Sequence, residues 1–206
     1  MEVARDRGSV PEAPPPPARM EWTRPVRLEP PLREVKRVVL VGFMGSGKSA
    51  VGRRLARLLG WRFADMDREI VARDGRPVVR IFQEEGEPFF RELEDRTARD
   101  LLREERIVIS SGGGWPCRDD RLETLDRRTL AVWLMVTADG AVERISSSRT
   151  RRPLLEVADP RAEARRLLEV REPYYGLAHW HIRTEGRSSS SIAREIAGRL
   201  GDPDPG

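Results

Sequence analysis

The sequence predicts an α/β fold in which helices cover both faces of a central, five-stranded parallel sheet. Five short apolar runs alternate along the chain with stretches of helical periodicity, and repeated strand-helix units of this kind place their strands in parallel. The 206 residues provide for one domain of ordinary size with a single core, together with a tail. Ligands of such a sheet bind beyond the carboxyl ends of its strands, so functional residues are expected there.

The first strand-helix unit has the clearest limits. Residues 38–41 are an apolar, mostly β-branched run that leads into a glycine turn. Residues 49–59 then show helical spacing, which includes Val51 and Leu55, and Gly60 ends the helix. Further strands are expected at residues 61–64, 107–110, 131–136 and 179–183, and the closing helix at residues 192–200.

The two ends of the chain differ in composition from this central part. Residues 1–36 contain 8 of the 16 prolines and few aliphatic side chains, so they cannot bury enough apolar surface to offset the entropy of ordering. We therefore expect a disordered, Pro-rich N-terminal tail at 1–36, a domain at 37–201 and a disordered end at 202–206. The tail is either a passive extension or a segment that binds a partner protein.

Charge and cysteine content exclude several classes of protein. The chain has a formal charge of +4 and a pI of about 9.9, but its 34 acidic residues are interspersed among 38 basic ones. Because the few aromatic residues do not alternate with arginines, no nucleic-acid groove is expected. Cys117 is the only cysteine, which excludes an internal disulfide and fits a reducing cytoplasm. No apolar run reaches the roughly 20 residues of a membrane span, and the N-terminus lacks the apolar stretch of a secretory signal. A soluble, cytoplasmic protein is expected.

A glycine-rich motif follows the first strand. Residues 42–49 read Gly-Phe-Met-Gly-Ser-Gly-Lys-Ser and satisfy the Walker A pattern G-x-x-x-x-G-K-[ST]. In this pattern the backbone N–H groups and the N-terminus of the following helix bind the phosphates of a nucleotide. Lys48 reaches the β and γ phosphates, and Ser49 offers its hydroxyl to Mg²⁺. The motif predicts ATP binding by Gly45, Ser46, Gly47, Lys48, Ser49 and Ala50.

Beyond this loop, the order of motifs resembles the shikimate kinase family over about residues 37–200. The matching segments are an acidic pair within 63–67, an FR-x-x-E element within 81–94, Ser-Gly-Gly-Gly at 111–114, Arg-Pro-Leu-Leu at 152–155 and Arg-Glu-Pro-Tyr-Tyr at 171–175. The resemblance implies the fold of a P-loop kinase with a lid and a substrate-binding helical segment. It also implies transfer of the γ-phosphoryl group of ATP to the 3-hydroxyl of shikimate, with Mg²⁺ as cofactor. Such an enzyme would act as a monomer in aromatic amino acid biosynthesis.

The resemblance assigns the chemistry to two carboxylates. Asp67 resembles the residue that hydrogen-bonds the acceptor hydroxyl and takes its proton, and Asp65 resembles the one that holds the water shell of Mg²⁺ beside Ser49. In phosphoryl transfer, positioning and charge neutralisation matter more than a strong base. Two carboxylates two residues apart can divide these tasks only if the backbone leaves the strand between them.

Further residues are implied to bind the acceptor. Arg91 and Arg171 resemble the pair that clamps the carboxylate of shikimate, for which a planar guanidinium is better suited than an ammonium group. Gly112, Gly113 and Gly114 resemble the loop whose backbone amides reach this substrate.

A lid and an adenine contact are implied as well. Arg152, in the polar and basic segment 146–155, resembles the lid arginine that closes over the phosphates and excludes water. Arg149 and Arg151 could share this task, and Arg187 falls where the family commonly touches the adenine. The catalytic residues are therefore expected to be Lys48, Asp67 and Arg152.

Three positions depart from the pattern of the family. Ala50 stands where Thr is usual, Trp115 and Pro116 follow the triple glycine, and the arginine that precedes the lid aligns only loosely with Arg144. Because neighbours of the glycine loop shape the acceptor pocket, two alternatives to shikimate phosphorylation stay open. One is a related P-loop kinase that acts on another small hydroxy acid or sugar acid. The other is a nucleotide-binding regulatory module without catalysis.

Overall fold

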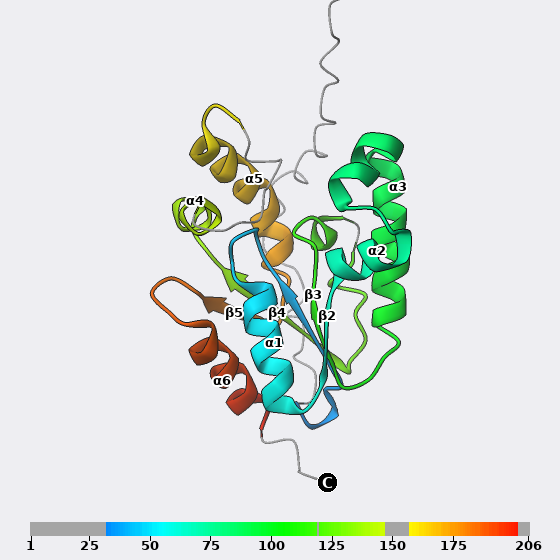
Figure 1. Cartoon of the computed structure of the whole chain (residues 1–206). Coiled ribbons are helices and arrows are strands. Elements are labelled where there is room, and N and C mark those ends of the chain that lie inside the picture. The colour runs from blue at the N-terminus through cyan, green and yellow to red at the C-terminus, as the bar shows by residue number, and fades with distance from the viewer. Residues whose placement is uncertain (1–31, 119, 147–156, 202–206) are drawn as a thin grey trace, which may run out of the picture.

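The structure, a computed structural model, describes residues 32–118, 120–146 and 157–201 (Figure 1). The predictions made for residues 1–31, for residues 202–206 and for the lid arginines Arg149, Arg151 and Arg152 fall outside the described residues.

Residues 32–36, which composition places in the tail, pack on the domain. Leu32–Glu34 form a short 3₁₀ helix, η1, and Val35 is buried against the core. The amide of Ile107 donates to the carbonyl of Lys36. The packed part of the chain therefore begins before the first strand.

Five strands form one sheet, in which each strand is parallel to its neighbours in the order β2-β3-β1-β4-β5. This confirms the predicted five-stranded parallel sheet. All five strands begin and end close to their expected limits: β1 (Arg37–Val41), β2 (Arg62–Asp65), β3 (Ile107–Ser110), β4 (Thr129–Met135) and β5 (Trp180–Arg183).

Helices connect the strands, as repeated β-α units require. They are α1 (Lys48–Leu59), α2 (Met66–Asp74), α3 (Val78–Leu101), α4 (Ala138–Ser146), α5 (Pro160–Tyr175) and α6 (Ser189–Leu200), with a second 3₁₀ turn, η2 (Trp115–Cys117). Among the described residues, none of these helices combines the length and the apolarity that a membrane span requires.

The central strand divides its side chains between two cores. Val38 and Leu40 of β1 belong to the core that α1 and α6 cover. Val39 and Val41 belong to the core on the opposite face, which includes residues of α3 and α5. Because successive side chains of a strand point to opposite faces, a strand with helices on both sides is apolar throughout. Figure 1 shows α1 and α6 side by side on one face of the sheet, which confirms the predicted layers.

A bent helix stands beside the sheet. Gly86 has a φ of 81°, which interrupts α3 between its two halves. The first half packs on α2 around a small separate core of Ile70, Ile81 and Phe90. Phe90 is therefore a core residue, and the ring of Phe82 lies 4.5 Å from it while its side chain is partly exposed. This unit carries Asp67 on α2 and Arg91 on α3, two of the predicted substrate-binding residues.

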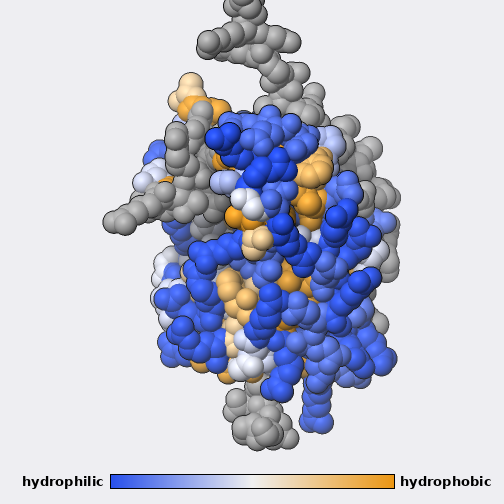
Figure 2. Space-filling view, turned by 45° about the vertical axis from the view of Figure 1, so that its right-hand side comes forward, coloured by the Kyte–Doolittle hydropathy of each residue, from blue (hydrophilic) through white to orange (hydrophobic). Residues whose placement is uncertain are grey.

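Most charged side chains of the described surface pair with one another. Figure 2 shows a largely hydrophilic face with scattered apolar patches. Arg76, for example, contacts Asp74, Glu84 and Glu85 at 2.7 to 3.0 Å. Interspersed charges of both signs therefore give a mixed surface on this part of the molecule.

Candidate active site

The Walker A loop connects β1 to α1. Gly45 and Gly47 adopt φ values of 77° and 91°, in the left-handed region that favours glycine. A Cβ atom on Gly45 would lie 2.9 Å from the carbonyl oxygen of Ala141, so α4 leaves no room for a side chain there. Gly47 is the N-cap of α1 and provides no side-chain cap, and Ala50 lies in the first turn. The N-terminus of α1 thus presents its N–H groups to an anion.

The Walker A loop encloses the ammonium group of Lys48 and the buried hydroxyl of Ser46. Lys48 Nζ donates to the carbonyl oxygens of Gly42 and Phe43 at 2.7 and 3.0 Å. Ser46 is 1% exposed, and its Oγ has no hydrogen-bond partner among the described residues. A buried hydroxyl without a partner is destabilising, and a phosphate oxygen in the loop would supply the missing partner.

Oxygen atoms suited to a divalent cation gather where β1, β2 and β3 meet the loop. Ser49 Oγ donates to Asp65 Oδ2 at 2.5 Å and lies 3.3 Å from Ser110 Oγ. Mg²⁺ prefers oxygen ligands and keeps several waters. Among the residues that the structure describes, no cluster of three or more His, Cys, Asp or Glu side chains could hold a metal by itself. The donors present therefore fit a Mg²⁺ ion that also takes ligands from water and nucleotide phosphates.

The two carboxylates of the acidic pair lie on different elements. β2 ends at Asp65 and α2 begins at Met66, so the backbone leaves the strand between Asp65 and Asp67. Asp67 lies in the first turn of α2, where the helix dipole favours a negative charge. Its Oδ1 atom is 3.5 Å from the position that a Cβ atom on Gly112 would take. One carboxylate thus joins the metal-binding oxygens, and the other faces the triple glycine.

The rest of the triple glycine contacts the two predicted carboxylate-binding arginines. A Cβ atom on Gly113 would lie 3.6 Å from Arg171 Nη1. A Cβ atom on Gly114 would lie 2.9 Å from Arg91 Nη1, so any larger residue would displace that guanidinium. The loop therefore brings both arginines and the carboxylate of α2 to one place, as the resemblance implies.

Two carboxylates hold Arg91 in a fixed orientation. Arg91 donates through Nε and Nη2 to Glu87 Oε1, at 3.0 and 2.8 Å, and through Nη1 to Glu94 Oε2 at 2.8 Å. A guanidinium has five N–H donors, so these bonds leave one donor on each Nη atom. The remaining Nη donors can therefore bind a carboxylate.

The ion pairs of Arg91 raise its own pKa and lower that of Glu94, whereas burial acts on each group in the reverse sense. Burial lowers the pKa of Arg91, but Glu94 and Glu87 raise it by more, so it lies above its ordinary value. Burial raises the pKa of the Glu94 carboxyl, and the nearby Arg91 opposes this rise only in part. Arg91 consequently keeps its positive charge at neutral pH.

Arg171 approaches from the opposite side. It lies on α5, four residues before the last residue of the helix, and its guanidinium carbon is 5.9 Å from the centroid of the Phe43 ring in the Walker A loop. Four residues later on the same helix face, Tyr175 is fully buried, and its hydroxyl donates to the carbonyl oxygen of Gly113 at 2.6 Å. The Walker A loop, the triple glycine and α5 therefore meet at this point.

Trp115 does not line the acceptor site, although it follows the triple glycine directly. Its side chain is 3% exposed and belongs to the core between α3 and the sheet. It borders a separate cavity of about 530 Å³ between α3 and the segment that leads to β4, which also includes Arg121 and Leu125. The departure from the family pattern at this position therefore lies in the core.

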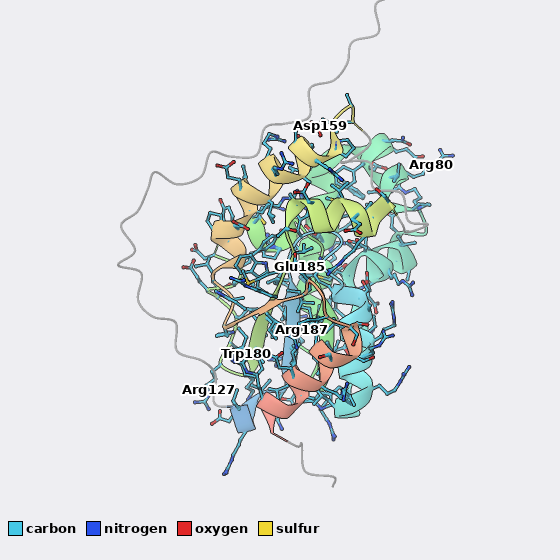
Figure 3. All side chains as sticks on the ribbon, turned by 90° about the vertical axis from the view of Figure 1, so that its left-hand side faces the viewer. Arg80, Arg127, Asp159, Trp180, Glu185 and Arg187 are labelled. Carbon is cyan, nitrogen blue, oxygen red and sulfur yellow. The ribbon has the colours of Figure 1, made fainter. Side chains whose placement is uncertain are left out.

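Arg144 and Arg187 lie on the side of the loop that faces α4. Arg144 Nη1 donates to the carbonyl of Gly45 at 3.2 Å and to Thr184 Oγ1 at 2.9 Å, so the loosely aligned arginine does reach the Walker A loop. Arg187 lies between β5 and α6, near Glu185 in Figure 3, and forms a 2.5 Å ion pair with Glu195. The structure thus places Arg187 on a connection that borders the nucleotide side of the site.

Sequence reasoning missed three residues that the geometry brings into the site. Glu94 was recognised only as part of the FR-x-x-E element, yet it is 1% exposed and orients Arg91. Ser110 ends a buried strand next to the metal-binding oxygens, and Tyr175 supports the triple glycine. Only the spacing of three residues between Arg91 and Glu94, on one helix face, could have indicated such a pairing from the sequence.

Comparison with known proteins agrees with this arrangement. A family model described as shikimate kinase matches residues 44–200. The chain is 43% identical to a shikimate kinase of Moorella thermoacetica, over 77% of this chain and 91% of that protein. It is 40% identical to a shikimate kinase of Thermus thermophilus, over 84% and 94% of the two chains. The structure of shikimate kinase from Acinetobacter baumannii in complex with shikimate matches with a TM-score of 0.75 and 35% identity, over 81% of this chain and 93% of that one.

Proposed function

The chain belongs to the shikimate kinase family, and we propose that it transfers the γ-phosphoryl group of ATP to the 3-hydroxyl of shikimate, giving shikimate 3-phosphate and ADP. The observation that carries this assignment is the triple glycine, around which Asp67, Arg91 and Arg171 converge beside the Walker A loop. One carboxylate and two guanidinium groups match an acceptor that has a hydroxyl to be activated and a carboxylate to be held.

The acceptor is held by its carboxylate and by backbone amides. The two N–H donors that Arg91 retains face one side of the triple glycine, and Arg171 faces the other. The amides of Gly112, Gly113 and Gly114 donate to no other residue in the described part of the chain, so they are available to substrate hydroxyls. Positioning of this kind supplies much of the rate enhancement in phosphoryl transfer.

Asp67 accepts the hydrogen bond of the attacking hydroxyl and takes its proton as the bond to phosphorus forms. Lys48 and the N-terminus of α1 neutralise charge on the phosphates. A Mg²⁺ ion, if bound, would supply positive charge that stabilises the negative charge of the phosphates. Ser49 and Asp65 are the residues that would hold it, directly and through water.

Further roles follow from the resemblance. They are closure of a lid through Arg152, with Arg149 or Arg151, and contact of Arg187 with the adenine. We also propose a cytoplasmic monomer without a nucleic-acid partner, whose catalytic domain spans residues 37–201. The pairing of surface arginines with acids supports the expectation of no nucleic-acid partner, since it leaves a mixed surface where a basic groove would be required.

An ADP-release assay with a panel of carboxylated polyols tests the function. ADP release should depend on both ATP and shikimate and should fall sharply in Asp67→Asn and Arg91→Ala. Turnover of another hydroxy acid or sugar acid without turnover of shikimate would instead favour the related kinase. ATP binding without ADP release from any acceptor would favour the regulatory module.

A further inference from the structure

A single backbone carbonyl in the triple glycine receives two side-chain donors. The hydroxyl of Tyr175 donates to the Gly113 oxygen at 2.6 Å, and the thiol of Cys117 donates to the same oxygen at 3.7 Å. Burial raises the pKa of the Cys117 thiol to about 11 and raises that of the Tyr175 hydroxyl well above 10, so both keep the protons that they donate. These two hydrogen bonds therefore constrain the triple glycine at its central residue, Gly113.

The orientation of this carbonyl determines the orientation of the next amide. In a trans peptide the C=O and the following N–H point in opposite directions, and the described residues contain no cis peptide bond. Because the Gly113 oxygen points toward the buried Tyr175, the N–H of Gly114 points away from it. That N–H donates to no other described residue, and the Arg91 guanidinium lies beside Gly114. The amide is thus presented on the side where the acceptor binds.

The position of the Tyr175 hydroxyl is itself fixed by the sheet. Tyr175 is fully buried, and its ring lies 5.9 Å from that of Trp133 on β4. Trp133 in turn packs against the ring of His181 on β5, at 5.2 Å. A side chain that is enclosed in this way keeps one rotamer, so the position of its hydroxyl is fixed. Arg171, one turn earlier on α5, lies next to the same glycine.

We propose that Tyr175 is a positioning residue for the acceptor: its hydroxyl orients the Gly113–Gly114 peptide and thereby sets the affinity for shikimate without touching the substrate. This inference depends on the proposed function, because it concerns the acceptor side of the same site. Cys117 is a second, weaker donor to the same carbonyl. The nucleotide side, built by the Walker A loop, does not depend on this hydrogen bond.

The test compares two neighbouring tyrosines, which are the only two in the chain. Tyr175→Phe removes one hydroxyl from a buried position, and Tyr174→Phe makes the same chemical change on a partly exposed residue. Losing one buried hydrogen bond should raise the KM and the Kd for shikimate about tenfold in Tyr175→Phe. The KM for ATP should stay within about twofold of the wild-type value, and Tyr174→Phe should alter neither parameter.

A second variant tests whether the effect passes through the Gly113 carbonyl. Cys117→Ala alone should raise the KM for shikimate by no more than about threefold, because a thiol is a weak donor. The double variant with Tyr175→Phe leaves the Gly113 carbonyl without either donor. Its increase in the KM for shikimate should exceed the product of the increases in the two single variants. If the two substitutions acted independently, the increase in the KM for shikimate in the double variant would equal the product of the two single increases.

The outcomes separate the inference from the function on which it depends. Absence of shikimate-dependent ADP release by the wild-type protein would reject the proposed function. Normal wild-type turnover with an unchanged KM for shikimate in Tyr175→Phe would overturn the positioning role. Equal increases in the KM for shikimate and for ATP, accompanied by a lower thermal midpoint, would also overturn it, since Tyr175 would then act only on folding.

Discussion

The hydroxyl of Ser49, at the start of α1, donates to a carboxylate oxygen of Asp65, at the end of β2, over 2.5 Å. This bond joins the two loops that the resemblance connects with Mg²⁺, although the residues are far apart in the sequence. Both groups are acceptors for a cation or its waters, so the pair is arranged before any metal binds.

Replacement of Asp65 should therefore weaken the response to Mg²⁺. In Asp65→Asn the concentration of Mg²⁺ that gives half-maximal activity should rise by about 10- to 100-fold, the usual cost of losing an outer-shell carboxylate. Titration of ADP release with MgCl₂ measures this concentration, and EDTA should abolish activity in both proteins. Asp100→Asn, which alters surface ion pairs with Arg73 and Arg103, is the control. An identical Mg²⁺ dependence in Asp65→Asn and the wild type would contradict the role of Asp65.

The second carboxylate should affect catalysis more than binding. Asp67→Asn keeps the size of the side chain in the first turn of α2 but removes the proton acceptor. We expect kcat to fall by about 10²- to 10⁴-fold, the contribution of a well-placed general base, while the Kd for ATP stays unchanged. Steady-state kinetics and calorimetric titration with ATP measure the two quantities. A fall in kcat of less than about threefold would remove Asp67 from the catalytic set.

The guanidinium group of Arg91 should determine how tightly the acceptor binds. Arg91→Lys keeps a positive charge near Glu94, but an ammonium group has three N–H donors in place of five and cannot bind a carboxylate in a planar, bidentate manner. Losing a charge-assisted bidentate contact costs about 1.5 to 3 kcal/mol, so the KM for shikimate should rise by about 10- to 150-fold. Arg96→Ala, an exposed position on the same helix, should leave this KM unchanged. Equal KM values in Arg91→Lys and Arg96→Ala would contradict a carboxylate clamp.

Local patterns predicted the sheet and the Walker A loop, and the family resemblance added the acidic pair and the triple glycine. The Walker A loop, the acidic pair and the triple glycine each follow an apolar strand, and residues at the carboxyl ends of parallel strands come together. The expectation that the backbone turns between Asp65 and Asp67 followed from their different tasks, and the end of β2 at Asp65 agrees with it.

Other features depend on contacts that no local pattern specifies. The order β2-β3-β1-β4-β5 is decided by how the helices pack. The direction of Trp115, into the core and away from the acceptor, is decided by the 3₁₀ turn that it begins. The hydrogen bond of Tyr175 to Gly113 joins residues that are 62 positions apart. Composition also placed residues 32–36 in the tail, because the burial of Val35 depends on strands that come later in the chain.

The last prediction concerns the pH dependence that Glu94 gives to acceptor binding. Burial raises the pKa of its carboxyl above the usual 4.5, Arg91 opposes the rise, and Asp67 and Asp95 add to it. The ionised form accepts the hydrogen bond that orients Arg91. As the pH falls through this raised pKa, Glu94 becomes protonated, Arg91 loses an anionic partner, and kcat/KM for shikimate should decrease.

The effect of the same group on stability has the opposite sign. Between the unfolded and the folded pKa, the folded state binds more protons at Glu94, so its contribution to stability increases as the pH falls. Acidification should therefore reduce acceptor affinity while the protonation of Glu94 itself favours the folded state. Glu94→Gln, which is neutral at every pH, should have a raised KM for shikimate at pH 7 and a flatter dependence of that KM on acidification. Parallel KM profiles for Glu94→Gln and the wild type between about pH 5 and 7 would show that another group controls the orientation of Arg91.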